Sequence, residues 1–287
     1  METSGGDIMI EGTNSDKVEI SVMIKNNGNT ITEDDPLFKK FNEYYDLEIE
    51  KIEDENKIVA YAKRIGKLND WHFKLGVSFN VKVPYSTSNK IHVNSGNIKI
   101  LDQSGTHKYT TSSGNIFLSN ITGKSKIVTS GGNVEIDNCE GFSEIRISGG
   151  ELFINRSKGN INAITSGGKV SLDEINGKVH LRNSGGHVAV SGHSNSINVV
   201  NNGGITANLT GLKEELYLNT TGGDIRVEVS GSPGMNLDLN AEELNIKLPD
   251  DFNGNQKNSY VLGSVNGGGI PVKVQATGGK IDFFLNK

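Results

Sequence analysis

Several features that mark familiar protein classes are scarce in this chain of 287 residues. Cys139 is the single cysteine, which excludes an intrachain disulfide and a zinc site built from several cysteines. With only 5 prolines, the composition fits neither a collagen-like chain nor a proline-rich disordered one. Hydrophobic residues make up 34% of the sequence, which is little for one thick globular core.

Long apolar and basic segments are missing as well. No apolar run approaches the roughly 18 residues that a membrane-spanning helix needs, so we expect no membrane-spanning segment. Residues 1–6 are polar and lack the apolar core of a signal peptide, so the chain is either cytosolic or has lost a signal segment. The net charge is −5 and no basic run is interleaved with aromatic residues, so we expect no nucleic-acid partner.

Glycine, in contrast, is abundant at 36 residues and is regularly spaced. Seven glycines recur at a constant 18-residue interval: Gly96, Gly114, Gly132, Gly150, Gly168, Gly186 and Gly204. Halfway between them lies a second series: Gly105, Gly123, Gly141, Gly159 and Gly177, with Asn195 in the next position. A polar series precedes the first one by two positions: Asn94, Ser112, Ser130, Ser148, Ser166, Ser184 and Asn202.

Between these glycines, apolar residues alternate with polar ones, which is the period of a β-strand. Each repeat unit therefore reads as strand, turn, strand, turn, with glycine allowing the tight corners. Ordering one such unit costs roughly 27 kcal/mol, more than its four or so inward aliphatic side chains recover at about 1.5–3 kcal/mol each. The units must therefore stack, and the sequence predicts an all-β solenoid with 18-residue coils.

The parts flanking the repeats differ from them. We assign residues 1–90 to an N-terminal β-rich cap, 91–229 to the regular solenoid and 230–287 to an irregular insertion followed by closing coils. The repeat slips by one position near Gly203 and Gly204. In the cap, residues 4–10 read as a coil strand and Asp34–Asp46 as a short helix. Further cap strands are expected at Lys17–Lys25, Leu47–Ile52, Lys57–Ala62 and Phe73–Val83.

These motifs resemble a known family. The segment VSFNVKVPYSTSNKIHVNSGNIKILD from Val77 to Asp102, the recurring Ser-Gly-Gly-x-Val/Ile-x-Ile/Val units and the closing Gly-Gly-Gly-Ile-Pro-Val resemble the bacterial auto-transporter adhesin family. The resemblance covers nearly the whole chain. It implies a domain of unknown function with a right-handed parallel β-helix and an exported location, at the cell surface or in the periplasm. It implies no catalytic residue.

Calcium binding and glycoside hydrolysis are two kinds of chemistry that a repeat of this type can support. Calcium-binding β-rolls need Gly-Gly-x-Gly-x-Asp, but Gly131 and Gly132 are followed by Asn-Val-Glu-Ile, so we expect no metal and no other cofactor. Asp137 and Asp173 fall in one column, two coils and thus roughly 9.6 Å apart. That separation is near the range of inverting glycosidases, so a polysaccharide-degrading enzyme is the alternative hypothesis. Aspartate is also simply a common turn residue.

The favoured hypothesis is a non-catalytic binding protein. Outward columns carry Phe117 and Phe153, and a parallel column alternates Arg146 and Arg182 with aliphatic residues. Exposed apolar side chains beside arginine are typical of a contact surface, so we expect these four residues to bind a glycan or a cell-envelope protein. Alternatively, residues 230–265 or the cap cover this surface. The sequence leaves the oligomeric state open.

Overall fold

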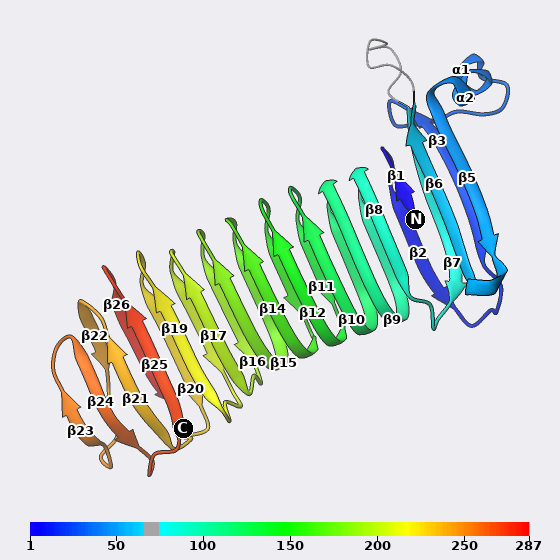
Figure 1. Ribbon diagram of the computed structural model, residues 1–287. Coiled ribbons are helices and arrows are strands. Elements are labelled where there is room, and N and C mark those ends of the chain that lie inside the picture. The colour runs from blue at the N-terminus through cyan, green and yellow to red at the C-terminus, as the bar shows by residue number, and fades with distance from the viewer. Residues whose placement is uncertain (66–74, 287) are drawn as a thin grey trace. The chain divides into compact units, whose positions relative to one another are not determined.

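The computed structural model describes residues 1–65 and 75–286, and it divides the chain into two compact units, residues 1–132 and 133–287. Among the described residues nearly all regular structure is strand, so the all-β prediction is confirmed (Figure 1). The helical segments of the described chain are short: α1 (Pro36–Lys39), α2 (Phe41–Tyr44) and the 3-10 turn η1 (Glu53–Glu55).

The described part of the first unit contains ten strands besides these helical turns. They are β1 (Glu2–Thr3), β2 (Ile8–Thr13), β3 (Glu19–Asn26), β4 (Asn29–Thr30), β5 (Tyr45–Ile52), β6 (Lys57–Arg64), β7 (Leu75–Pro84), β8 (Asn89–Ser95), β9 (Ile98–Ser113) and β10 (Ile116–Thr129). The strands expected before residue 91 are therefore present, although Phe73 and Lys74 of the last one lie outside the described residues. The expected helix is present as two short pieces, and Asp35 caps the first by accepting a hydrogen bond from the Leu37 amide.

The regular part of the first unit is a parallel ladder. Strand β9 pairs with β10 so that Ile98 lies beside Ile116 and Tyr109 beside Ile127. Both pairs are separated by the 18-residue interval of the glycines. The alternating side chains predicted to point inward are buried on both strands. The sequence pattern therefore identified the core positions of these strands correctly.

Strands β1 and β2 lie out of chain order. Strand β2 is parallel to β7 on one edge and to β9 on the other, and β1 lies in the same way between β6 and β8. Beyond them, β3 is antiparallel to β7 and β5 is antiparallel to β6. Residues 2–13 thus join the cap strands to the ladder that begins at β8 (Figure 1).

Within residues 133–286 the second unit has sixteen strands. They are β11 (Val134–Asp137), β12 (Glu140–Ile147), β13 (Leu152–Asn155), β14 (Lys158–Thr165), β15 (Val170–Asn183), β16 (Val188–Gly192), β17 (Ser196–Asn201), β18 (Ile205–Leu209), β19 (Glu215–Thr220), β20 (Ile225–Ser230), β21 (Met235–Asn240), β22 (Glu243–Ile246), β23 (Asn253–Gln256), β24 (Tyr260–Val265), β25 (Ile270–Ala276) and β26 (Lys280–Asn286). Strands β11, β13 and β15 pair in parallel at the same 18-residue interval, and so do β12, β14 and β15.

The register changes where the sequence pattern slips. Val188 pairs with Ile205, one position short of the regular interval, whereas Ile197 pairs with Leu216, one position beyond it. The inward side chains of Ile205 and Ala207 are buried, as predicted.

The irregular segment forms the outermost strands of this unit. Strand β25 lies between β19 and β21, and strand β26 lies between β20 and β22. All four pairings are parallel (Figure 1, red between yellow and orange). Strand β24 is antiparallel to β21, and β23 is antiparallel to β24. An insertion with closing strands was expected from the sequence, but the placement of the closing strands inside it was not.

Corner residues take backbone conformations that favour glycine. Gly168 and Gly186 have φ angles of +85° and +78°, and a Cβ on Gly168 would lie 2.1 Å from the carbonyl oxygen of Gly150. Buried polar side chains bind the corner carbonyls: Asn201 Nδ2 donates to the carbonyls of Gly186 and Gly204, both at 3.0 Å. At these corners glycine permits the close approach of neighbouring strands, and a buried amide side chain supplies hydrogen bonds to the corner carbonyls.

Candidate functional site

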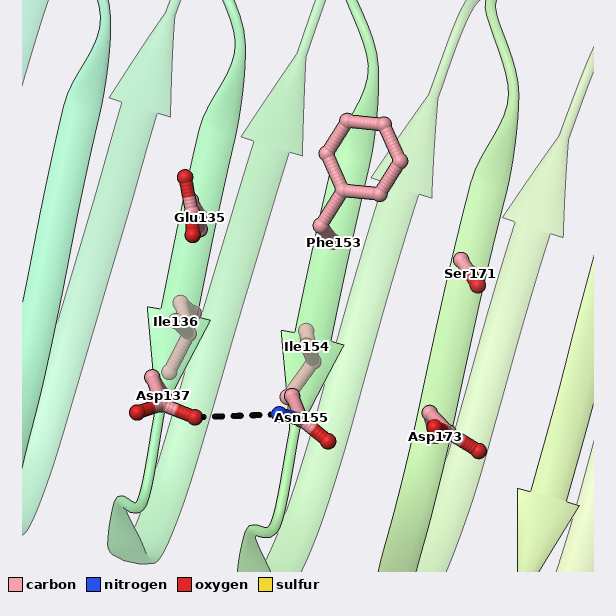
Figure 2. Close-up of a pocket in the computed structure, with 8 residues that line it drawn as sticks. All are labelled: Glu135, Ile136, Asp137, Phe153, Ile154, Asn155, Ser171 and Asp173. Carbon is pink, nitrogen blue, oxygen red and sulfur yellow. Dashed lines mark hydrogen bonds between the residues drawn. The ribbon is translucent and has the colours of Figure 1, made fainter.

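The candidate site is a shallow depression of about 200 Å³ on the outer surface of strands β11, β13 and β15 (Figure 2). The strands are parallel neighbours, so equivalent positions lie side by side about 4.8 Å apart. Eight residues line the depression: Glu135, Ile136, Asp137, Phe153, Ile154, Asn155, Ser171 and Asp173.

Strand alternation explains why these side chains gather. Glu135, Phe153 and Ser171 occupy one column of paired positions. Asp137, Asn155 and Asp173 occupy another, two positions further along each strand and therefore on the same face. Between the columns Ile136 and Ile154 point into the core and are buried. In Figure 2 the Phe153 ring stands between Glu135 and Ser171, above the row of the two aspartates and Asn155.

The carboxylate of Asp137 is held by two neighbours. Asn155 Nδ2 donates to its Oδ1 at 3.2 Å. The Nη2 of Arg156 donates to Oδ1 at 2.6 Å and to Oδ2 at 2.7 Å. Arg156 reaches this position from a left-handed corner, where its φ is +48°. Both oxygens of Asp137 therefore act as acceptors in a charge-assisted arrangement.

The carboxylate of Asp173 has a different partner. Ser191 Oγ donates to Asp173 Oδ1 from the next strand, β16. Asp173 is exposed and Asp137 is half-buried. The rim of the depression thus carries three carboxylates, Glu135 included, and the guanidinium of Arg156 compensates one of them.

The structure brings the two aspartates of the enzyme hypothesis to one depression, with the Asn155 side chain in the row between them. A general acid in glycoside hydrolysis must hold a proton and donate it to the leaving oxygen. Asp137 instead uses both oxygens to accept hydrogen bonds from Arg156. The arrangement suits hydrogen bonding to a ligand better than proton transfer.

The four residues predicted to bind are not all gathered here. Phe153 is half-buried in the depression. Arg146 on β12 and Arg182 on β15 occupy the other strand of each repeat, in one column with Ile164 between them. Arg146 is paired with Glu144 at 2.6 Å, and Ile164 remains 43% exposed, so residues 230–265 do not cover this column.

Phe117 belongs to the first unit, where it is half-buried and has the Lys99 Nζ 5.7 Å from its ring centroid. Sequence reasoning missed Arg156, Ser171 and Ser191 as neighbours of the aspartates. The 18-residue interval applied to each outward position would have placed Ser171 and Ser191, but only the corner backbone shows where Arg156 points.

Residues 1–65 and 75–286 contain neither a candidate metal cluster nor a helix that could span a membrane. No cluster of three or more histidine, cysteine, aspartate or glutamate side chains there could hold a metal ion. In the same residues, no helix has the length and apolarity to cross a membrane.

Comparison with known proteins identifies a family for this chain. A family profile described as Toastrack DUF4097 matches residues 1–283. Comparison with curated proteins gives no match. A crystal structure from Clostridium sporogenes, described as that of a "putative cell adhesion protein", aligns with 99% of this chain and 91% of its own at 12% identity, with a TM-score of 0.19. The profile describes a domain of unknown function, as the sequence resemblance implied, and the adhesin designation stays a prediction.

Proposed function

Because the chain belongs to the Toastrack DUF4097 family, whose function is not defined, we propose a function from the site itself: a non-catalytic binding module of the adhesin or cell-envelope type. The observation that carries this proposal is the depression beside Phe153, where an aromatic ring borders a row of hydrogen-bonding side chains. Ligand sites combine apolar or aromatic side chains with a few convergent polar groups, and this depression has both on a small, open surface.

A glycan is the ligand that this chemistry suits best. The C–H face of a sugar ring packs on an aromatic ring, and sugar hydroxyls donate hydrogen bonds to carboxylates and amide oxygens. Glu135, Asp137 and Asp173 supply such acceptors around Phe153. The same carboxylates repel anionic sugars, so the proposed ligand of this depression is a neutral glycan. Because the depression is open, it can accommodate an internal segment of a longer glycan.

The proposal includes the architecture and the location implied by the sequence. We propose a right-handed parallel β-helix with 18-residue coils, divided into a cap of residues 1–90, a solenoid of 91–229 and an end piece of 230–287. The parallel pairing of Ile98 with Ile116 and of Leu152 with Val170 supports the coil length. An experimental structure would decide the handedness, and cell fractionation would test the proposed export to the cell surface or periplasm.

The test is a glycan array probed with the full chain and two phenylalanine variants. We expect binding to a neutral glycan, and we expect Phe153→Ala to weaken it about tenfold, since a buried aromatic contact contributes more than about 1 kcal/mol. Phe142→Ala is the matched control, because Phe142 is 39% exposed on the same unit and does not line the depression. Equal binding by both variants would refute the proposed site.

Arg146→Ala and Arg182→Ala complete the array experiment. If these variants lose binding while Phe153→Ala keeps it, the contact surface is the arginine column and the depression is not involved. Full chains with unchanged melting temperatures are required for each comparison.

The enzyme hypothesis remains a second candidate because Asp137 and Asp173 line one depression. It predicts release of new reducing ends from polyuronides or other polysaccharides. We expect no such release with the purified chain. Turnover that Asp173→Asn abolishes would establish the enzyme and refute the non-catalytic proposal.

A further inference from the structure

The first unit carries a basic surface that the proposed function does not use. Outward positions of residues 88–94, 106–112 and 124–130 form it, and we call it the lysine face. It holds Lys90, Lys108, Lys124 and Lys126 together with His92, and none of the three segments contains an aspartate or a glutamate. Since the whole chain has a net charge of −5, this face opposes the overall charge.

Three of the lysines stack on neighbouring strands. Lys90 on β8 pairs in register with Lys108 on β9, and Lys108 pairs with Lys126 on β10. Lys124 lies two positions before Lys126, beside Thr106, and so points to the same side of the sheet. Neighbouring parallel strands are about 4.8 Å apart, so the stack presents one cation per strand in a straight row.

Like charges side by side in a sheet destabilise it unless something compensates them. Lys90 and Lys108 are exposed, and neither they nor Lys124 form a salt bridge with any residue in the described part of the chain. The nearest column carries His92 beside Glu2 on one side and Thr110 on the other. A ligand that supplies several anions would therefore remove repulsion as well as form contacts.

The remaining side chains of the face narrow the class of ligand. Its other outward residues are mostly hydroxyl and amide side chains, such as Ser88, Thr106 and Asn94. Tyr109 is the one tyrosine, phenylalanine or tryptophan in the three segments, and it is fully buried. Tyr61 lines a hollow beside Lys90 and Lys108, but a single ring does not provide the series of rings on which successive nucleic-acid bases stack. No residue of these segments is among the exposed large hydrophobic side chains, so the face offers no apolar wedge to a lipid surface.

We propose that the lysine face binds a linear acidic polysaccharide that carries a carboxylate on each sugar, running across strands β8, β9 and β10. Such a chain carries carboxylates along its whole length, so those that face the sheet pair with lysines of the row. The hydroxyl side chains between the lysines hydrogen-bond the sugar ring. This site is separate in chemistry from the depression at Phe153, which repels anions.

Salt dependence follows from the number of cations. If three lysines displace counterions, the affinity falls by roughly 20- to 40-fold between 50 and 200 mM salt, taking the slopes measured for nucleic acids as a guide. Neutral glycan binding at Phe153 has no such dependence.

The experiment measures binding of the full chain to size-defined polygalacturonate by calorimetry at several salt concentrations. We expect binding that weakens with salt and that Lys108→Gln reduces about fivefold, while Lys108→Arg retains it. Lys169→Gln is the matched control, because Lys169 is exposed on the second unit and its loss changes the net charge equally. Lack of binding to polygalacturonate, or an equal loss in Lys169→Gln, would overturn the proposal.

Three further probes separate the alternatives. Dextran tests a neutral polysaccharide, a single-stranded oligodeoxynucleotide tests a nucleic acid, and vesicles with anionic lipids test a membrane surface. Tighter binding to the oligonucleotide or to vesicles than to polygalacturonate would also overturn the proposal. Because Phe153→Ala should leave polygalacturonate binding unchanged, failure here is distinguishable from failure of the depression.

Discussion

Replacing Gly168 with alanine tests the corner geometry most directly. The backbone at Gly168 has a φ of +85°, and an added Cβ would lie 2.1 Å from the carbonyl oxygen of Gly150 on the neighbouring strand pair. Neither corner can move freely, because each lies between strands that are paired with their neighbours, β12 with β14 before it and β13 with β15 after it. Gly167, the preceding residue, is the matched control: a Cβ there meets nothing within 4 Å, and its φ lies outside the left-handed region.

The size of the effect can be worked out from these contacts. A side chain in the left-handed region costs about 1–2 kcal/mol. Relieving the overlap requires the two corners to move apart, which weakens the adjoining hydrogen bond from the Leu152 amide to the Lys169 carbonyl at about 1 kcal/mol. Gly168→Ala should therefore lower the free energy of unfolding by about 3 kcal/mol. Gly167→Ala should raise it by about 0.4–1 kcal/mol by restricting the unfolded chain.

Urea denaturation followed by far-ultraviolet circular dichroism measures both variants against the parent chain. A loss of about 3 kcal/mol corresponds to a melting temperature lower by roughly 6–12 °C for a unit of this size. If Gly168→Ala and Gly167→Ala unfold within about 1 kcal/mol of each other, the stacked-corner explanation of the glycine series is wrong.

Two other predictions concern buried polar groups. Asn201 is fully buried and donates to two carbonyls, so Asn201→Ala should lower the free energy of unfolding by about 1–3 kcal/mol, whereas the exposed Asn202→Ala should change it by less than about 0.5 kcal/mol in the same urea assay. His107 is 1% exposed, and burial lowers its pKa to about 4. The unfolded chain, with a pKa near 6.5, therefore gains a proton first as pH falls, and stability should drop between about pH 6.5 and 4 by at most about 3 kcal/mol. Urea titrations at several pH values should show a weaker drop for His107→Gln, and an unchanged drop would contradict this assignment.

The repeat and its core could be predicted from sequence because each signal is local. Glycine at a fixed interval marks the corners, and alternation marks which side chains point inward. Both signals survive even at the register change, where Ile205 resumes the inward phase and is buried. The same reasoning could place Phe153 on the outer face, since it lies between the inward Leu152 and Ile154.

Other features depend on contacts that the sequence pattern does not encode. Arg156 and Glu174 adopt left-handed corners that asparagine occupies at the equivalent position 138, and neither residue type signals such a backbone. The salt bridge from Arg156 to Asp137 follows from that corner and so could not be foreseen. The two aspartates, in contrast, lie in one column as the 18-residue interval predicted, because Asp137 pairs with Asn155 and Asn155 pairs with Asp173.

The placement of β2 and β25 has a consequence for how the chain is assembled during synthesis. Strand β2 leaves the ribosome before both of its neighbours, β7 and β9, and β25 leaves it after both of its neighbours, β19 and β21. The stack therefore cannot grow strand by strand in the order of translation. Residues 2–13 must wait for partners, and β19 and β20 keep open edges until residues 270–286 arrive. During that interval those edges can pair with another chain, so aggregation of incomplete chains is the specific hazard of this topology.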